Sequence, residues 1–117
     1  MLTLPPQMRI YAHLSPTDMR KSFDGLCALV RSSFQADPTD GSLFLFINRR
    51  RDRIKMLYWD RDGLAIWYKR LERGTLESLR AADGEATIEL DAVQLAMLLG
   101  GVALASAKRR KRYAVVG

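Results

Sequence analysis

The sequence predicts an α+β fold in which a long N-terminal helix packs on an antiparallel meander sheet, followed by a short C-terminal helix and a basic tail. Three observations support this fold. A strong helix-start signal precedes an apolar stripe, short turn-forming loops separate three strand-like runs, and a second capped apolar stretch precedes a run of bases. A chain of 117 residues suffices for one core but not two. We therefore expect a single domain over residues 1–107 and a basic tail over residues 108–117.

The expected long helix follows a short strand within residues 8–14. Ser15 is a favourable N-cap residue, Pro16 suits the first helical position, and Asp18 complements the positive helix N-terminus. Apolar residues then recur at steps of three or four, which is the spacing of one helix face. This stripe, expected to pack on the sheet, consists of Met19, Phe23, Leu26, Val30 and Phe34.

The expected meander follows a turn at residues 37–41. Its three extended runs are residues 43–47, 54–59 and 64–69. The connecting loops are short enough for antiparallel neighbours, and the second contains the hairpin signal Asp62-Gly63.

The C-terminal part predicts one more strand and one more helix. Residues 86–90 have strand character, and Asp91 with Gln94 three residues later forms a variant of the capping box. Gly100 and Gly101 end the helix.

The charge of the chain is concentrated at its C-terminus. The net charge is +6, and five of the positive charges lie in the run 108–112, so the rest of the chain carries only +1. Polyanions are the partners that such a balance favours. The chain contains no apolar run of membrane-spanning length and no signal-peptide pattern, so we expect a cytoplasmic protein without membrane contact.

Catalytic chemistry has little support in this sequence. The chain has one histidine, His13, and one cysteine, Cys27, and both are better explained as structural residues than as a catalytic pair. Asp60 and Asp62 resemble a magnesium pair but flank an expected hairpin turn. We therefore expect no enzyme, no metal site and no cofactor.

Basic side chains are the best candidates for a binding site. Exposed arginine and lysine side chains reach phosphates without burial, and a mobile basic run commonly binds nucleic acid. The alternative is that the charges keep a loop and a tail soluble and protect the sheet from pairing. Aromatic residues interleave with these bases and could stack on unpaired bases, although sheet core is the commoner role for Trp59 and Trp67. The candidate nucleic-acid-binding residues are Arg49, Arg50, Arg51, Arg53, Lys55, Lys69, Arg70, Arg73, Lys108, Arg109, Arg110, Lys111 and Arg112.

The segment Asp18-Met19-Arg20-Lys21-Ser22-Phe23-Asp24-Gly25-Leu26, together with later matches such as Trp59-Asp60, resembles the TnpB-type accessory proteins of insertion sequences of the sixty-six family. The resemblance covers most of the chain. The residues of this sequence that carry the most specific part of the motif are Asp18, Met19, Arg20, Lys21, Phe23, Asp24, Gly25, Trp59 and Asp60.

The resemblance implies a non-catalytic accessory protein of DNA transposition, encoded beside a separate transposase. Two hypotheses follow from it. In the first, the protein binds DNA through the basic hairpin loop and the tail. In the second, it is a protein-interaction subunit that binds or stabilises the transposase without contacting DNA. An open sheet edge would also allow a homodimer.

Overall fold

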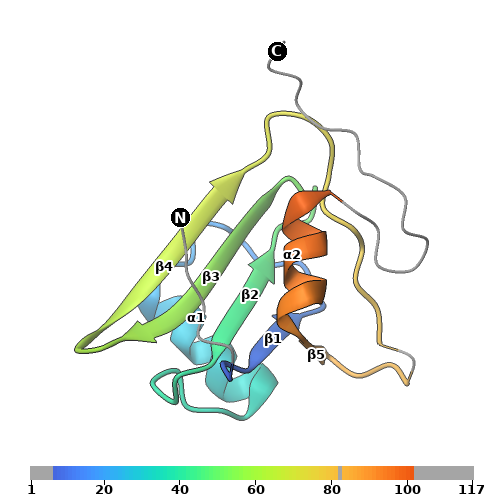
Figure 1. Cartoon of the computed structure of the whole chain (residues 1–117). Helices are drawn as coiled ribbons and strands as arrows, with labels where there is room; N and C mark the ends of the chain where they lie inside the picture. The colour runs from blue at the N-terminus through green and yellow to red at the C-terminus, as the bar shows by residue number, and fades with distance from the viewer. Residues whose placement is uncertain (1–6, 82, 102–117) are drawn as a thin grey trace.

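The computed structural model describes residues 7–81 and 83–101, which form a five-stranded mixed sheet with helices on both faces (Figure 1). The order of strands across the sheet is β4-β3-β2-β1-β5. The strands are β1 (Ile10–His13), β2 (Leu43–Ile47), β3 (Arg53–Asp60), β4 (Gly63–Arg70) and β5 (Thr87–Leu90). The helices are α1 (Phe23–Leu29), the π-helical turn η1 (Val30–Phe34) that continues it, and α2 (Ala92–Gly100).

The three middle runs form the antiparallel strands that their sequence predicts. Phe44 of β2 lies opposite Leu57 of β3, and Met56 of β3 lies opposite Trp67 of β4. The β3–β4 connection is a tight turn in which Arg61 adopts a left-handed conformation with φ of 58°. This geometry brings Asp60 opposite Gly63, as two-residue hairpin loops require.

The core lies on both faces of the sheet because β2 is covered on both sides. Every residue of β2 is buried, and a continuous apolar run is what such a strand needs. On one face, α1 and η1 cover Phe44, Phe46 and Leu57. On the other, α2 and the chain that follows β4 cover a second cluster (Figure 1), whose buried members are Ile10, Ala12, Leu43, Leu45, Ile47, Ile54, Met56, Leu76, Leu90, Leu95 and Leu98.

The predicted architecture, a long helix on a meander, is wrong in two respects. The first helix begins at Phe23 and its α-helical part contains seven residues. Residues 15–22 are not helical, because long-range bonds use their backbone groups: Thr17 N–H donates to the Ile47 carbonyl at 2.8 Å. Ser15 is therefore not an N-cap, and its carbonyl oxygen instead lies 2.9 Å from His13 Nδ1.

The second correction concerns the sheet, which is mixed. β1 runs parallel to β2 and antiparallel to β5, so it lies between strands that are distant in sequence. The α1–η1 segment is the crossover that joins the parallel pair β1 and β2, which a two-residue hairpin cannot join. The sheet is therefore covered on both faces instead of one.

The C-terminal helix agrees with its sequence signals. The Asp91 carboxylate accepts the Gln94 N–H at 2.7 Å, and the Gln94 side chain accepts the Asp91 N–H at 2.9 Å. Gly101 ends the helix with φ of 81°, a conformation that favours glycine. Within the described ranges, no helix is long and apolar enough to cross a membrane. The expected tail, residues 108–117, lies outside these ranges.

Candidate nucleic-acid interface

The loop between β2 and β3 is ordered by one side chain. Asn48 Oδ1 accepts the N–H groups of Asp52 and Arg53, each at 3.0 Å, and Asn48 Nδ2 donates to the Asp52 carboxylate at 2.7 Å. Arg51 supports the turn with a left-handed φ of 58° and an N–H bond of 3.1 Å to the Asn48 carbonyl. The arginines are therefore displayed on a defined turn and not on a loose connection.

The chain that follows β4 is fastened to the same loop. Leu71 N–H donates to the Asp52 carbonyl at 2.7 Å, and Leu76 N–H donates to the Arg51 carbonyl at 2.6 Å. Leu76 is also buried in the core, which anchors this segment. The bases of the loop and those at the end of β4 and just after it therefore meet at one end of the sheet. We call this set the basic end: Arg49, Arg50, Arg51, Arg53, Lys69, Arg70 and Arg73.

The centre of the basic end is a pair of like charges. Arg53 of β3 lies directly opposite Arg70 of β4, and like charges in this position destabilise a sheet. Each guanidinium has one partner: Arg70 Nη2 lies 2.9 Å from the Glu72 carboxylate, and Arg53 Nη1 donates to the Tyr68 hydroxyl at 3.3 Å. A bound anion would remove the repulsion between the two arginines.

A shallow cleft of about 450 Å³ lies beside the loop. Arg49, Arg50 and Arg53 line one side, and the segment from Pro16 to Met19 lines the other. Arg49 and Arg50 are exposed. The cleft is therefore lined by three arginines, of which Arg53 is half-buried.

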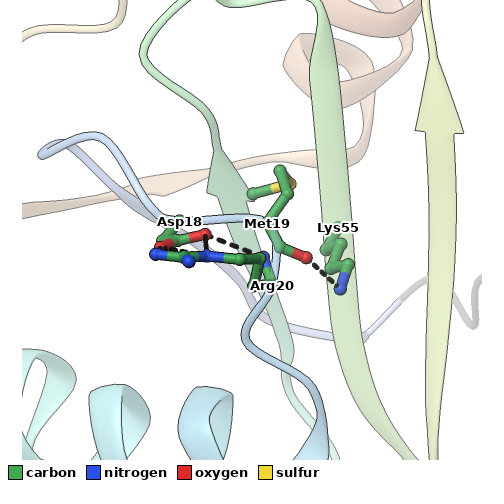
Figure 2. Close-up of polar contacts among 4 residues, drawn as sticks. All are labelled: Asp18, Met19, Arg20 and Lys55. Atoms are coloured by element: carbon green, nitrogen blue, oxygen red, sulfur yellow. Dashed lines mark hydrogen bonds and ion pairs between the residues drawn. The ribbon is translucent and has the colours of Figure 1, made fainter.

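One carboxylate, that of Asp18, also lines this cleft. Arg20 lies 2.6 Å from Asp18 (Figure 2), and its side-chain and backbone hydrogen bonds lower the pKa of Asp18 to about 2. Because Arg20 offsets the charge of Asp18, the excess of positive charge in the cleft comes from the other arginines.

Lys55 differs from the other candidate bases because it is buried, with only 7% of its surface exposed. Its ammonium donates to the carbonyl oxygens of Met19 at 2.8 Å and Lys21 at 2.7 Å (Figure 2 shows the first of these bonds) and lies 4.7 Å from the centre of the Tyr68 ring. Lys55 is therefore committed to internal partners and is not presented to a ligand.

Lys69 and Arg73 belong to the basic end but do not line the cleft. Both are exposed, and Lys69, opposite Ile54, points to the other face of the sheet from Arg70. The five bases of the tail, Lys108, Arg109, Arg110, Lys111 and Arg112, lie outside the described residues.

The motif residues do not form one site. Asp18, Met19, Arg20 and Lys21 shape the segment that Lys55 binds. Gly25 follows on α1, where a Cβ atom would lie 3.2 Å from the side chain of Lys21. The other members lie apart: Phe23 and Asp24 are exposed on α1, and Trp59 and Asp60 lie at the far end of β3 from the arginines.

His13 and Cys27 have the structural environments that the sequence suggests. His13 Nδ1 lies 2.9 Å from the Ser15 carbonyl oxygen, and Nε2 lies 3.1 Å from Ser33 Oγ. Cys27 is buried under the sheet, and this burial raises the pKa of its thiol. The sequence places Tyr68 among the bases as one of several aromatic residues, but its contacts with Arg53 and Lys55 depend on the pairing of β3 with β4. The sequence analysis missed the role of Asn48, although its partners Asp52 and Arg53 are only four and five residues away.

The fold and the site define a small one-sheet domain with a solvent-exposed basic end. The chain belongs to the family described as IS66 Orf2-like proteins, whose model matches residues 8–109. This match confirms the resemblance seen in the sequence. The family is one of transposition-associated accessory proteins and is not a known enzyme class.

Two similar proteins come from Sinorhizobium fredii, and both are described as uncharacterized. The protein y4jC is 33% identical over 103 residues, which cover 88% of this chain and 86% of the relative. The protein y4hO is 32% identical over 102 residues, which cover 87% of each chain. No solved structure matches this chain significantly.

Proposed function

We propose that this chain is a non-catalytic accessory protein of transposition that binds DNA through its basic end. The observation that carries the proposal is the opposition of Arg53 and Arg70, beside exposed Arg49 and Arg50. Four guanidinium groups at one end of a sheet form a positively charged surface that can bind the phosphates of DNA. Each arginine can bind a phosphate through two parallel hydrogen bonds to its oxygens. In this proposal, the bases of residues 108–112 make a second contact with the phosphate backbone of the DNA.

Phosphate binding of this kind has a measurable signature. Each neutralised phosphate releases counterions, so the logarithm of the association constant falls with the logarithm of salt by about 0.9 per contact. Four contacts from Arg49, Arg50, Arg53 and Arg70 would give a slope of about −3.6. Engagement of the tail would make the slope steeper.

The test is fluorescence anisotropy on a labelled duplex from the end of the element and on a scrambled duplex, across a salt series. We expect the Arg49→Gln/Arg50→Gln variant to bind both more weakly and to lose about 1.8 from the magnitude of the slope. The matched control is Arg31→Gln/Arg61→Gln, which removes the same charge from η1 and from the opposite hairpin tip. Deletion of residues 108–112 measures the contribution of the tail.

Three results would contradict the proposal: a flat salt response, no binding at low salt, or equal losses in the test and control variants. Similar affinities for the element end and the scrambled duplex would show that the basic end reads the backbone and not the sequence.

A second candidate function is binding to the transposase of the same element. The observation that favours it is an open groove of about 760 Å³ between residues 77–81, 83 and 85 and the edge strand β5. Leu79 and Ile88 are apolar lining residues of the groove, and Asp83, Glu85 and Glu89 line it with acidic groups, of which Glu89 is paired with Arg9. Arg80 also lines the groove. Partly apolar surfaces with charged rims are typical of protein interfaces.

This second function is tested by co-purification with the transposase. The variant Leu79→Asp/Ile88→Asp changes the groove, whereas Arg49→Gln/Arg50→Gln leaves it intact. Loss of co-purification in the first variant alone would support the groove, provided that circular dichroism shows both variants folded. Retention of the transposase by the groove variant would contradict it.

A further inference from the structure

Tyr68 is an exposed aromatic residue beside the Arg53–Arg70 pair of the basic end. About 48% of its surface is exposed. In the described ranges, the other exposed large hydrophobic residues are Phe23 and Val93. Tyr68 pairs with Lys55 across β3 and β4. After the intervening pair Ile54–Lys69, which faces the other side of the sheet, the next pair on the same face is Arg53 with Arg70. Because side chains alternate along a strand, Tyr68 and Arg70 project from the same face of β4.

The ring of Tyr68 is held in place from two directions. The Lys55 ammonium lies 4.7 Å from the centre of the ring, and Arg53 Nη1 donates to the hydroxyl group at 3.3 Å. Lys55 cannot easily move away, because its ammonium is bound to two main-chain carbonyls. The ring is therefore pre-organised, while about half of the residue stays open to solvent.

Core packing does not explain an aromatic residue in this position. Trp67, the preceding residue, lies against the apolar cluster on the opposite face of the sheet. Tyr68 contacts the cations Lys55 and Arg53 instead, and Arg70 lies two residues further along β4 on the same face. A flat apolar surface between phosphate-binding groups matches the chemistry of a nucleotide, which carries a base and a phosphate on one sugar.

We propose that Tyr68 is a stacking platform for an unpaired base, and that the basic end prefers single-stranded DNA to duplex DNA. This inference rests on the proposed DNA binding and specifies its substrate. Bases within a duplex are stacked on their neighbours, so the ring gains a partner only where the strand is open or the base is flipped out. Arg53 and Arg70 hold the phosphates beside that base.

The test compares a labelled oligothymidine 15-mer with a duplex of equal length, at one low salt concentration. The variants are Tyr68→Phe, which keeps the ring, and Tyr68→Leu, which removes it. We expect the Phe variant to bind the single strand within about twofold of the parent protein and the Leu variant to bind it about tenfold more weakly. Both variants lose the hydroxyl group that accepts from Arg53, so any effect on duplex binding should be small and equal in the two, whereas the loss of single-strand binding should be confined to the Leu variant.

A spectroscopic measurement separates stacking from a general loss of structure. An oligonucleotide with one 2-aminopurine reports stacking as fluorescence quenching, which we expect with the parent protein and the Phe variant but not with the Leu variant. Arg50→Gln is the control, because it should weaken single-stranded and duplex binding alike. Thermal melting of each variant shows whether it remains folded.

The outcomes distinguish the two levels of the proposal. Equal effects of Tyr68→Leu on the single strand and the duplex, or no effect on either, would overturn the stacking platform while the proposed DNA binding stands. A parent protein that binds neither DNA at low salt would overturn both. Quenching that survives in the Leu variant would place the stacked base on another residue.

Discussion

The ammonium nitrogen of Lys55 lies 2.8 Å from the main-chain carbonyl oxygen of Met19 (Figure 2). The two residues are 36 positions apart, and a second bond of 2.7 Å joins the same ammonium to the Lys21 carbonyl. One buried cation in the sheet therefore holds the chain before α1 in a non-helical course. Its hydrogen bonds and the adjacent Tyr68 ring compensate the cost of burying the charge.

Replacing Lys55 with methionine should destabilise the fold. The substitution preserves most of the side-chain volume but leaves two carbonyls without their charged donor, so we expect the free energy of unfolding to fall by about 2–3 kcal/mol. Urea denaturation followed by tryptophan fluorescence measures this change. Lys69→Met, on the exposed end of β4, is the matched control and should change stability by less than about 0.5 kcal/mol. Equal effects at the two positions would refute the role assigned to Lys55.

Two residues carry N-cap signals in the sequence, but only one of them caps a helix. Asp91 accepts the Gln94 N–H at 2.7 Å, so Asp91→Ala should lower the free energy of unfolding by about 1 kcal/mol. Ser15 precedes a non-helical segment, so Ser15→Ala should change it by less than about 0.5 kcal/mol. Thermal or urea denaturation of both variants makes the comparison. A larger loss at Ser15 than at Asp91 would contradict the observed start of α1.

The carboxyl group of Asp18 should titrate with a pKa of about 2, because the side-chain and backbone hydrogen bonds of Arg20 favour its ionised form. The folded-state pKa is below the ordinary value, so the stabilisation is present above about pH 4 and is lost as the pH falls through about 2. Side-chain carbonyl NMR measures the midpoint directly. In Arg20→Gln the midpoint should rise only part of the way to 3.8, the ordinary value, since the backbone N–H of residue 20 remains. An unchanged midpoint in this variant would rule out Arg20 as the cause.

Cys27 should react slowly with thiol reagents in the folded protein. Only 6% of its surface is exposed, and burial raises the pKa of its thiol, so both access and the thiolate fraction are reduced at pH 8. We expect modification by a disulfide reagent to be more than about tenfold slower in buffer than in denaturant. Similar rates in the two solvents would show that α1 opens readily from the sheet.

The elements that could be predicted from the sequence depend on near neighbours. The hairpin around Asp62 and Gly63 and the capping box of Asp91 and Gln94 are formed by residues at most three positions apart, so local patterns contain the whole interaction. The arginine-rich loop could be predicted for the same reason. The match of Arg53 with Arg70 requires only that β3 and β4 form a hairpin, and its register then follows from the length of the turn.

The errors arose where distant residues decide the structure. Ser15 and Pro16 have a helix-start pattern, yet the Ile47 carbonyl and the Lys55 ammonium bind the backbone of the residues that follow them. In the sequence, Lys55 is one of several bases in a row and therefore looks like an exposed strand residue. Its burial is explained only by its position opposite Tyr68 and under the segment before α1. Neither contact has a signature in the local sequence.

By itself, the sequence determined the family, the hairpins, the capped C-terminal helix and the arginine-rich loop, because each is encoded by residues close together in the chain. Only the tertiary structure decided that β1 lies between β2 and β5, that Lys55 is an internal tether, and that Tyr68 stands among the arginines of the basic end. These features depend on contacts between residues about 15 to 80 positions apart. Such contacts form only when the whole chain buries its core, and a linear pattern of residue types does not specify them.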